Sequence, residues 1–128
     1  MPVEAHFDEE EDTLYWKWTG RVTGDDFFRS FQQATEFPGY RPGANIISDF
    51  TEADHILSTD TLLKSLDLLG IYKDQFGDSK VAIIVSNLRD YGLATMFSFI
   101  ARVTPLRAQA FMDPDRARIW LTLPYNKA

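Results

Sequence analysis

Acidic side chains and one histidine crowd a short loop of this sequence. Asp49 ends an apolar run, and Glu52, Asp54, His55 and Asp60 follow it. An imidazole among carboxylates has the donor atoms to hold a divalent metal or to act as a general base. No motif fixes the spacing, however, and the loop has a single histidine, so a solvated polar loop is the better interpretation. We keep Asp49, Asp54 and His55 as a candidate polar loop, and we expect neither a metal site nor a catalytic residue there.

Other common catalytic patterns are missing from the sequence. There is no cysteine, which excludes disulfides, zinc–thiolate sites and cysteine nucleophiles. No Ser-His-Asp order, phosphate loop or dinucleotide fingerprint occurs, and the string GRVTG has two glycines without the spacing of a phosphate-binding turn. We therefore expect a protein that is not an enzyme and that uses no cofactor.

A second group of residues points to binding. In a helix predicted over residues 89–103, Tyr91, Thr95, Phe99 and Arg102 lie on one face by the helical period. The opposite, core-facing stripe consists of Leu93, Met96, Phe97, Ile100 and Val103. Aromatic residues and arginine together on an exposed face are favoured at interfaces. The alternative is that Phe99 packs under a neighbouring loop or under the C-terminal tail.

Composition and charge narrow the class of protein. The chain has 128 residues, of which 45% are apolar, enough for one domain with a real core and too many for disorder. Its net charge is −6, and six acids without a base lie in the first twelve residues. No basic stripe follows, so we expect no nucleic-acid binding. No stretch is long and apolar enough to span a membrane, and the acidic N-terminus lacks the features of a signal peptide, so we expect a cytoplasmic protein.

The hydrophobic periods predict the order β-β-α-β-α-β-α-β-α in one domain over residues 1–128. Strands are predicted at 3–7, 13–19, 44–50, 80–86 and 106–111, the first two as a hairpin around the acidic turn. Helices are predicted from Thr23, which opens a capping box with Asp26, over 59–76, over 89–103, and from Pro114 after an Asp113 cap. Alternating strands and helices indicate an α/β fold with a four- to five-stranded mixed, mostly parallel sheet.

This order and several strings resemble the SpoIIAA-like branch of the STAS superfamily, whose first-described members are anti-sigma-factor antagonists. The strings are WTGRVTGDDF, IISDF, KVAIIVS and the closing FMDPDRARIWL. The resemblance covers nearly the whole chain, and its motifs are structural rather than chemical. It implies a sheet with helices packed around it, and some distant relatives of similar topology bind lipids, nucleotides or other small molecules.

The resemblance also raises the question of a phosphorylation switch. In antagonist members, a partner kinase phosphorylates a serine that begins the helix after the third strand. Ser58, with Thr59 beside it, matches by position, but the antagonist pattern Asp-Ser-Ser-Gly is replaced here by Leu57-Ser58-Thr59-Asp60. Asp60 would repel a neighbouring phosphate. We therefore favour a helix cap at Ser58 or Thr59 over the switch of an antagonist, and keep both residues as candidates for a cap or a phosphorylation switch.

Three functions follow from these observations. The first is a non-catalytic regulatory or protein-interaction module of the STAS type, which binds a protein partner or itself and is expected to form a homodimer. The second is a carrier of a small apolar molecule or lipid, in a pocket between helices lined by Leu63, Tyr72, Met96 and Phe99. The third is an enzyme that uses Asp49 and His55. The sequence does not name the partner, the ligand or the pathway.

Overall fold

A single mixed sheet organises the computed structural model, which describes residues 3–54 and 58–124. The strands lie in the order β1-β2-β3-β4-β5, with β1 and β2 antiparallel and every other neighbouring pair parallel. They are β1 (Val3–Asp8), β2 (Thr13–Gly20), β3 (Asn45–Ala53), β4 (Lys80–Ile84) and β5 (Arg107–Phe111). The mixed, mostly parallel sheet predicted from the sequence is confirmed.

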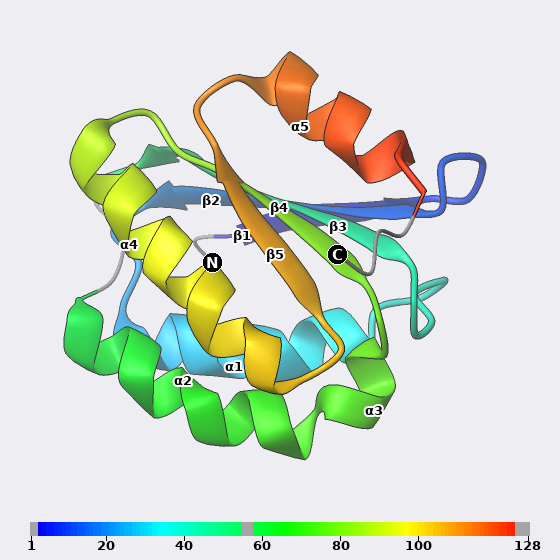
Figure 1. Ribbon diagram of the computed structural model, residues 1–128, viewed down its shortest axis with the longest axis horizontal. Helices are drawn as coiled ribbons and strands as arrows, with labels where there is room; N and C mark the ends of the chain where they lie inside the picture. The colour runs from blue at the N-terminus through cyan, green and yellow to red at the C-terminus, as the bar shows by residue number, and fades with distance from the viewer. Residues whose placement is uncertain (1–2, 55–57, 125–128) are drawn as a thin grey trace.

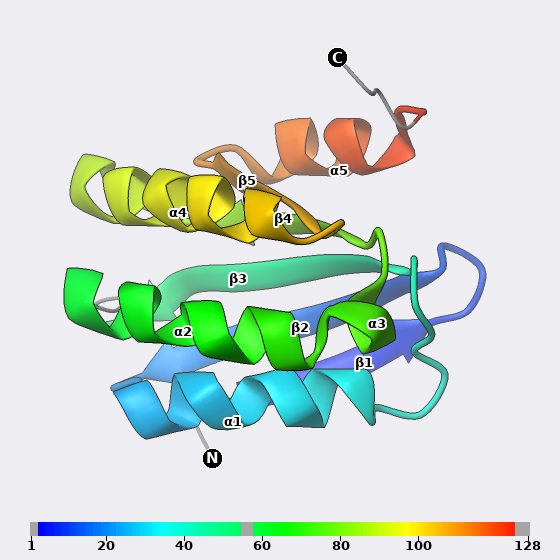
Figure 2. The same cartoon turned by 60° about the horizontal axis from the view of Figure 1, so that its bottom comes forward.

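Helices cover both faces of this sheet (Figure 1). On one face lie α1 (Gly24–Thr35), α2 (Thr59–Ile71), the short α3 (Lys73–Phe76) and α4 (Leu88–Ile100), which continues as a 3₁₀ turn, Ala101–Val103. On the other face lies α5 (Pro114–Thr122). In Figure 2, α1, α2 and α4 run side by side as one layer in front of the sheet. No helix in the described part of the chain is long and apolar enough to cross a membrane.

The strand period of two divides the core into two parts. In β3, Ile46 joins the large core beneath α1, α2 and α4, while its neighbour Ile47 joins a smaller core beneath α5. β4 repeats the pattern, with Val81 in the large core and Ala82 in the small one. The continuous apolar runs ANIISDF and KVAIIVS therefore belong to strands buried on both faces, as expected for parallel strands.

Helix starts follow the predicted caps. The Thr23 Oγ1 accepts a hydrogen bond from the Asp26 backbone N–H at 3.1 Å, and Asp26 Oδ2 accepts one from the Thr23 N–H at 3.0 Å. These two bonds are the reciprocal pair of a capping box. The Thr23 N–H, and after it the Thr23 side chain, stabilise the Asp26 carboxylate and hold the pKa of Asp26 below its usual value. Asp113 likewise caps α5, whose first residue is Pro114.

Two expectations about helices need correction. The helix predicted over 59–76 is interrupted at Tyr72, whose ψ of 10° leaves the helical range, so that α2 and α3 are separate. A hydrophobic period cannot reveal this break, because Phe76 still reaches the same core. Val103, assigned to the core stripe of the third helix, is 70% exposed because the helix tightens into a 3₁₀ turn after Ile100.

Tyr40 makes stability sensitive to alkaline pH. Its hydroxyl lies 2.6 Å from Ser79 Oγ, and burial raises its pKa from 10.0 to about 12. Between these values the folded protein keeps a proton that the unfolded chain has lost, so stability should fall as pH rises from about 10 to about 12 and be unaffected by this group below that window. Urea denaturation across the window should show a shallower fall in Tyr40→Phe. An equal fall in both proteins would assign it to other groups.

Candidate functional site

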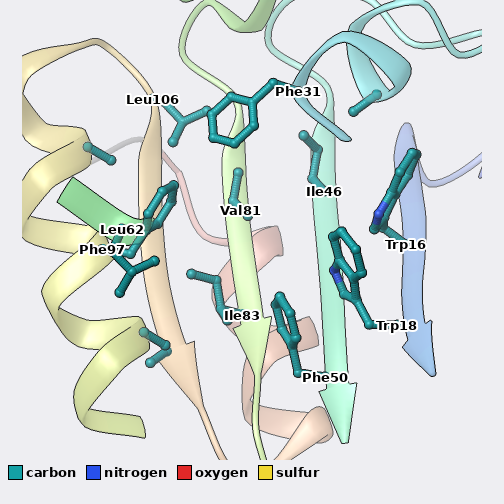
Figure 3. Close-up of a cluster of buried hydrophobic side chains, with 14 of the residues drawn as sticks. Trp16, Trp18, Phe31, Ile46, Phe50, Leu62, Val81, Ile83, Phe97 and Leu106 are labelled. Atoms are coloured by element: carbon teal, nitrogen blue, oxygen red, sulfur yellow. The ribbon is translucent and has the colours of Figure 1, made fainter. Parts of the chain in front are cut away.

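An apolar cavity of about 100 Å³ lies between the sheet and the helical layer. Its walls come from the helices α1, α2, α3 and α4, from the strands β2, β3 and β4, and from Leu106 just before β5. Figure 3 shows the side chains that gather there. Among them are Trp18, Phe31, Leu62, Ile83 and Phe97. Protein interiors hold few voids larger than a water molecule, which needs about 10–15 Å³. This cavity therefore has room for a small guest.

Rigid aromatic rings frame the cavity. The Trp18 indole stacks on Phe50 with 5.3 Å between ring centroids and 10° between planes. Phe27 meets Phe31 and Phe97 edge to face, at 5.3 and 6.1 Å. Such rings have few rotamers and cannot bend to fill a gap, so the space between them stays open.

Polar groups at the cavity wall are few. Trp18 Nε1 donates to Ser48 Oγ at 3.1 Å, and Ser30 Oγ donates to the Phe27 carbonyl at 2.6 Å, so both hydroxyls are engaged. The Trp16 Nε1 is buried without an acceptor among the described residues, and its ring meets Phe37 edge-on. None of the lining side chains is acidic or basic. The walls are suited to hold an apolar molecule and have no group to move a proton.

The pocket residues named from the sequence lie outside this cavity. Leu63 and Phe99 are 54% and 58% exposed. Tyr72 and Met96 pack against the rim of the large core without lining the cavity. The cavity is therefore deeper than the sequence indicated, directly on the sheet. In the sequence, the polar Ser48 within the run NIISDF is the one signal that this face of the sheet differs from ordinary packing.

The predicted face of α4 is partly exposed. Arg102 lies over the Phe99 ring, with the guanidinium carbon 4.6 Å from the ring centroid. Tyr91 is 40% exposed near the start of the helix, and Thr95 is half-buried between them. The structure thus brings Phe99 and Arg102 together. Phe99 stays 58% exposed, so no described residue buries its ring.

The acidic loop offers no metal site in the part that the structure describes. Asp49 Oδ1 accepts hydrogen bonds from the Thr51 N–H at 2.8 Å and from Thr51 Oγ1 at 2.7 Å, which forms a local turn. Asp54 is exposed, and His55 lies outside the described residues. Among residues 3–54 and 58–124, no group of three or more histidine, aspartate or glutamate side chains is arranged to hold a metal ion.

Ser58 is the N-cap of α2. Its Oγ accepts a hydrogen bond from the Thr61 N–H at 3.2 Å, and Thr59 is the first helical residue. The exposed position at a helix N-terminus is also compatible with a phosphate. The structure shows Ser58 as a helix cap, and phosphorylation of Ser58 stays a hypothesis.

Replacing Ser58 should therefore cost stability. Ser58→Ala removes the acceptor of the Thr61 N–H and should lower the free energy of unfolding by about 1 kcal/mol in urea denaturation. Thr59→Ala, one residue later and exposed, is the matched control and should change it by less than about 0.5 kcal/mol. Equal losses of stability in the two variants would mean that the hydrogen bond from the Thr61 N–H to Ser58 Oγ does not stabilise the fold.

Comparison with known proteins supports the fold. No family model and no curated protein matches the chain. A solved structure does: an uncharacterized protein from the DUF3478 family, with a SpoIIAA-like fold, from Shewanella loihica PV-4. The two chains share 22% sequence identity with a TM-score of 0.60, over 93% of this chain and 91% of that one. The fold expected from the sequence is thus confirmed: this chain has a SpoIIAA-like α/β fold.

Proposed function

We propose that this chain is a non-catalytic binding module whose cavity takes up a small apolar molecule. The observation that supports it is the cavity itself, about 100 Å³ of space walled by aromatic and aliphatic side chains. Apolar cavities of this kind stay free of water, because a water molecule there would lack the two to four polar partners it needs. An apolar guest, by contrast, makes dispersion contacts with the wall atoms, which otherwise lack contact partners on the side that faces the cavity.

The size of the cavity limits the guest. An engineered cavity of about 150 Å³ accepts benzene, so about 100 Å³ suits a ring of about five carbons or a short branched chain. A longer lipid would need α1, α2 and α4 to move outward. A guest held in this space would be bound and released unchanged, since no lining side chain is an acid or a base.

Cyclopentane is a direct probe of this proposal. Titration into ¹³C-methyl-labelled protein should give saturable shifts for Leu62, Leu69 and Ile83, which line the cavity. Methyl groups of Ile47 and Leu121, in the small core beneath α5, are the internal control and should not shift. Absence of any saturable shift up to the solubility limit of cyclopentane would refute the proposal.

A second candidate function is the interaction module that the sequence favours, with the outer face of the α2–α4 layer as its contact surface. The observation that supports it is the exposure of apolar side chains there: Leu63, Leu66 and Ile71 on α2, and Leu88, Tyr91 and Phe99 on α4. Interfaces favour aromatic residues and arginine, and Phe99 stacks with Arg102 on this face. The partner in this proposal is a second copy of the chain, which would make a homodimer.

Phe99→Asp tests the dimer. A charge in place of an exposed ring should weaken self-association about tenfold or more if Phe99 lies at the centre of the contact, as truncations of central aromatic residues do. Light scattering after size-exclusion chromatography would show the shift to monomer. Ile119→Asp, on α5 and 61% exposed, is the control for a general effect of added charge. A wild-type protein that is monomeric at all concentrations would contradict this candidate function.

A further inference from the structure

A buried hydrogen-bond donor in the wall of the cavity has no acceptor. Trp16 lines the cavity from β2 and is 5% exposed. Its Nε1–H finds no acceptor among residues 3–54 and 58–124. Buried donors in proteins are nearly always paired, because an unpaired donor has given up its hydrogen bond to water and gained none in return. The indole N–H of Trp16 therefore calls for a partner from outside the described chain.

The aromatic rings beside Trp16 do not meet this need. Trp16 packs against Trp18 and Phe37, with 6.4 Å between ring centroids in both pairs and 60° and 74° between the ring planes. An aromatic ring accepts an N–H only weakly. In Figure 3, the nitrogen of Trp16 lies on the side of its ring that faces Trp18 and Ile46, which also line the cavity. The N–H is thus placed to meet a partner inside the cavity.

The surroundings of this N–H limit the kind of partner. A water molecule would receive one hydrogen bond from Trp16, whereas a buried water makes about two to four. The hydroxyls of Ser30 and Ser48 in the same wall are already engaged, with the Phe27 carbonyl and the Trp18 indole. A charged guest would find no compensating charge, because no lining side chain is acidic or basic. An uncharged molecule with one acceptor atom on an apolar body satisfies both the N–H and the apolar walls.

We propose that the guest of the cavity carries one acceptor oxygen, as a small ketone or cyclic ether does, and that this oxygen accepts the hydrogen bond of Trp16 Nε1–H. This inference rests on the proposed function, since it names the chemical class of the same guest. A ring of about five atoms that includes an oxygen is no larger than the hydrocarbon ring that suits the cavity. Trp16 then determines specificity, because it favours an ether or a ketone over a hydrocarbon of the same shape and fixes the orientation of the guest.

Tetrahydrofuran and cyclopentane are a matched pair of probes, because an oxygen replaces one CH₂ group in a ring of the same size. In wild-type protein labelled with ¹⁵N and with ¹³C-methyl groups, tetrahydrofuran should move the Trp16 indole N–H signal downfield. This shift should saturate together with the methyl shifts of Leu62 and Ile83. Cyclopentane should shift the methyl signals without the downfield movement. The indole signal of Trp120, which does not line the cavity, is the internal control and should not move with either probe.

Trp16→Phe removes the donor and keeps an aromatic ring in the wall. The enlarged space acts on both probes, so the ratio of their Kd values isolates the hydrogen bond. This ratio should change about tenfold in favour of cyclopentane. Trp120→Phe, the same substitution on α5, is the matched control and should leave the ratio unchanged.

The possible failures of the two proposals are distinguishable. Saturable methyl shifts with cyclopentane, but no downfield shift of the Trp16 indole with tetrahydrofuran, would overturn the acceptor oxygen and leave the proposed function standing. Absence of saturable methyl shifts with both probes would overturn the proposed function and this inference with it. An equal change of the Kd ratio in Trp16→Phe and Trp120→Phe would also overturn the assignment of the hydrogen bond to Trp16.

Discussion

Replacing Ala94 with leucine should fill the cavity, abolish binding of cyclopentane and stabilise the protein. Ala94 is 3% exposed and lines the cavity from α4, and leucine adds three carbons at that point. Filling empty space of this size recovers up to about 2 kcal/mol, at roughly 24 cal/mol for each Å³ of cavity. Urea denaturation should therefore give a higher free energy of unfolding, while the saturable methyl shifts caused by cyclopentane disappear.

The same substitution on the other face of the sheet is the control. Ala117 of α5 is fully buried in the small core and does not line the cavity. Ala117→Leu should overpack that core and lower stability by about 1–3 kcal/mol. Opposite signs for the two variants would locate empty space under α4 and not under α5. A loss of stability in Ala94→Leu as large as that in Ala117→Leu would mean that neighbouring side chains already fill the space beside Ala94.

Trp18→Ala should cause the largest loss of stability, about 3–5 kcal/mol. The Trp18 side chain is 1% exposed, stacks on Phe50, and donates its indole N–H to Ser48. Its removal enlarges the cavity and also leaves Phe50 without its stacking partner. Because a domain of this size is stable by only about 5–15 kcal/mol, the midpoint of urea denaturation should fall steeply.

Trp120→Ala is the matched control for this loss. Trp120 lies on α5, is only partly buried, and packs on Phe111 with 5.5 Å between ring centroids. Its replacement should cost clearly less than the loss at Trp18, because part of its surface already contacts water. Similar losses of stability in the two variants would show that Trp18, in the cavity wall, contributes no more to the free energy of unfolding than Trp120 on α5.

Much of the fold was predictable because local signals agree with one another. The alternation in TLYWKWTG, the doubly buried runs of β3 and β4, and the caps at Thr23 and Asp113 each indicate one element, and the order of elements then requires a mostly parallel sheet. The break at Tyr72 was not predictable, because the apolar period continues across it to Phe76.

The candidate site was harder to predict, for a physical reason. A cavity is the space that side chains fail to fill, and it depends on how Trp18, Phe27 and Phe97 meet after folding. Each of these residues looks like ordinary core in the sequence.

Xenon tests the central claim most directly, because it enters apolar cavities and is visible in a crystal as a strong density peak. A crystal of the wild-type protein under xenon pressure should show xenon between the sheet and the layer of α1, α2 and α4, in contact with Leu62, Ile83 and Phe97. The Ala94→Leu crystal should show none there. Wild-type crystals without xenon at this position would contradict the claim that the cavity receives an apolar guest.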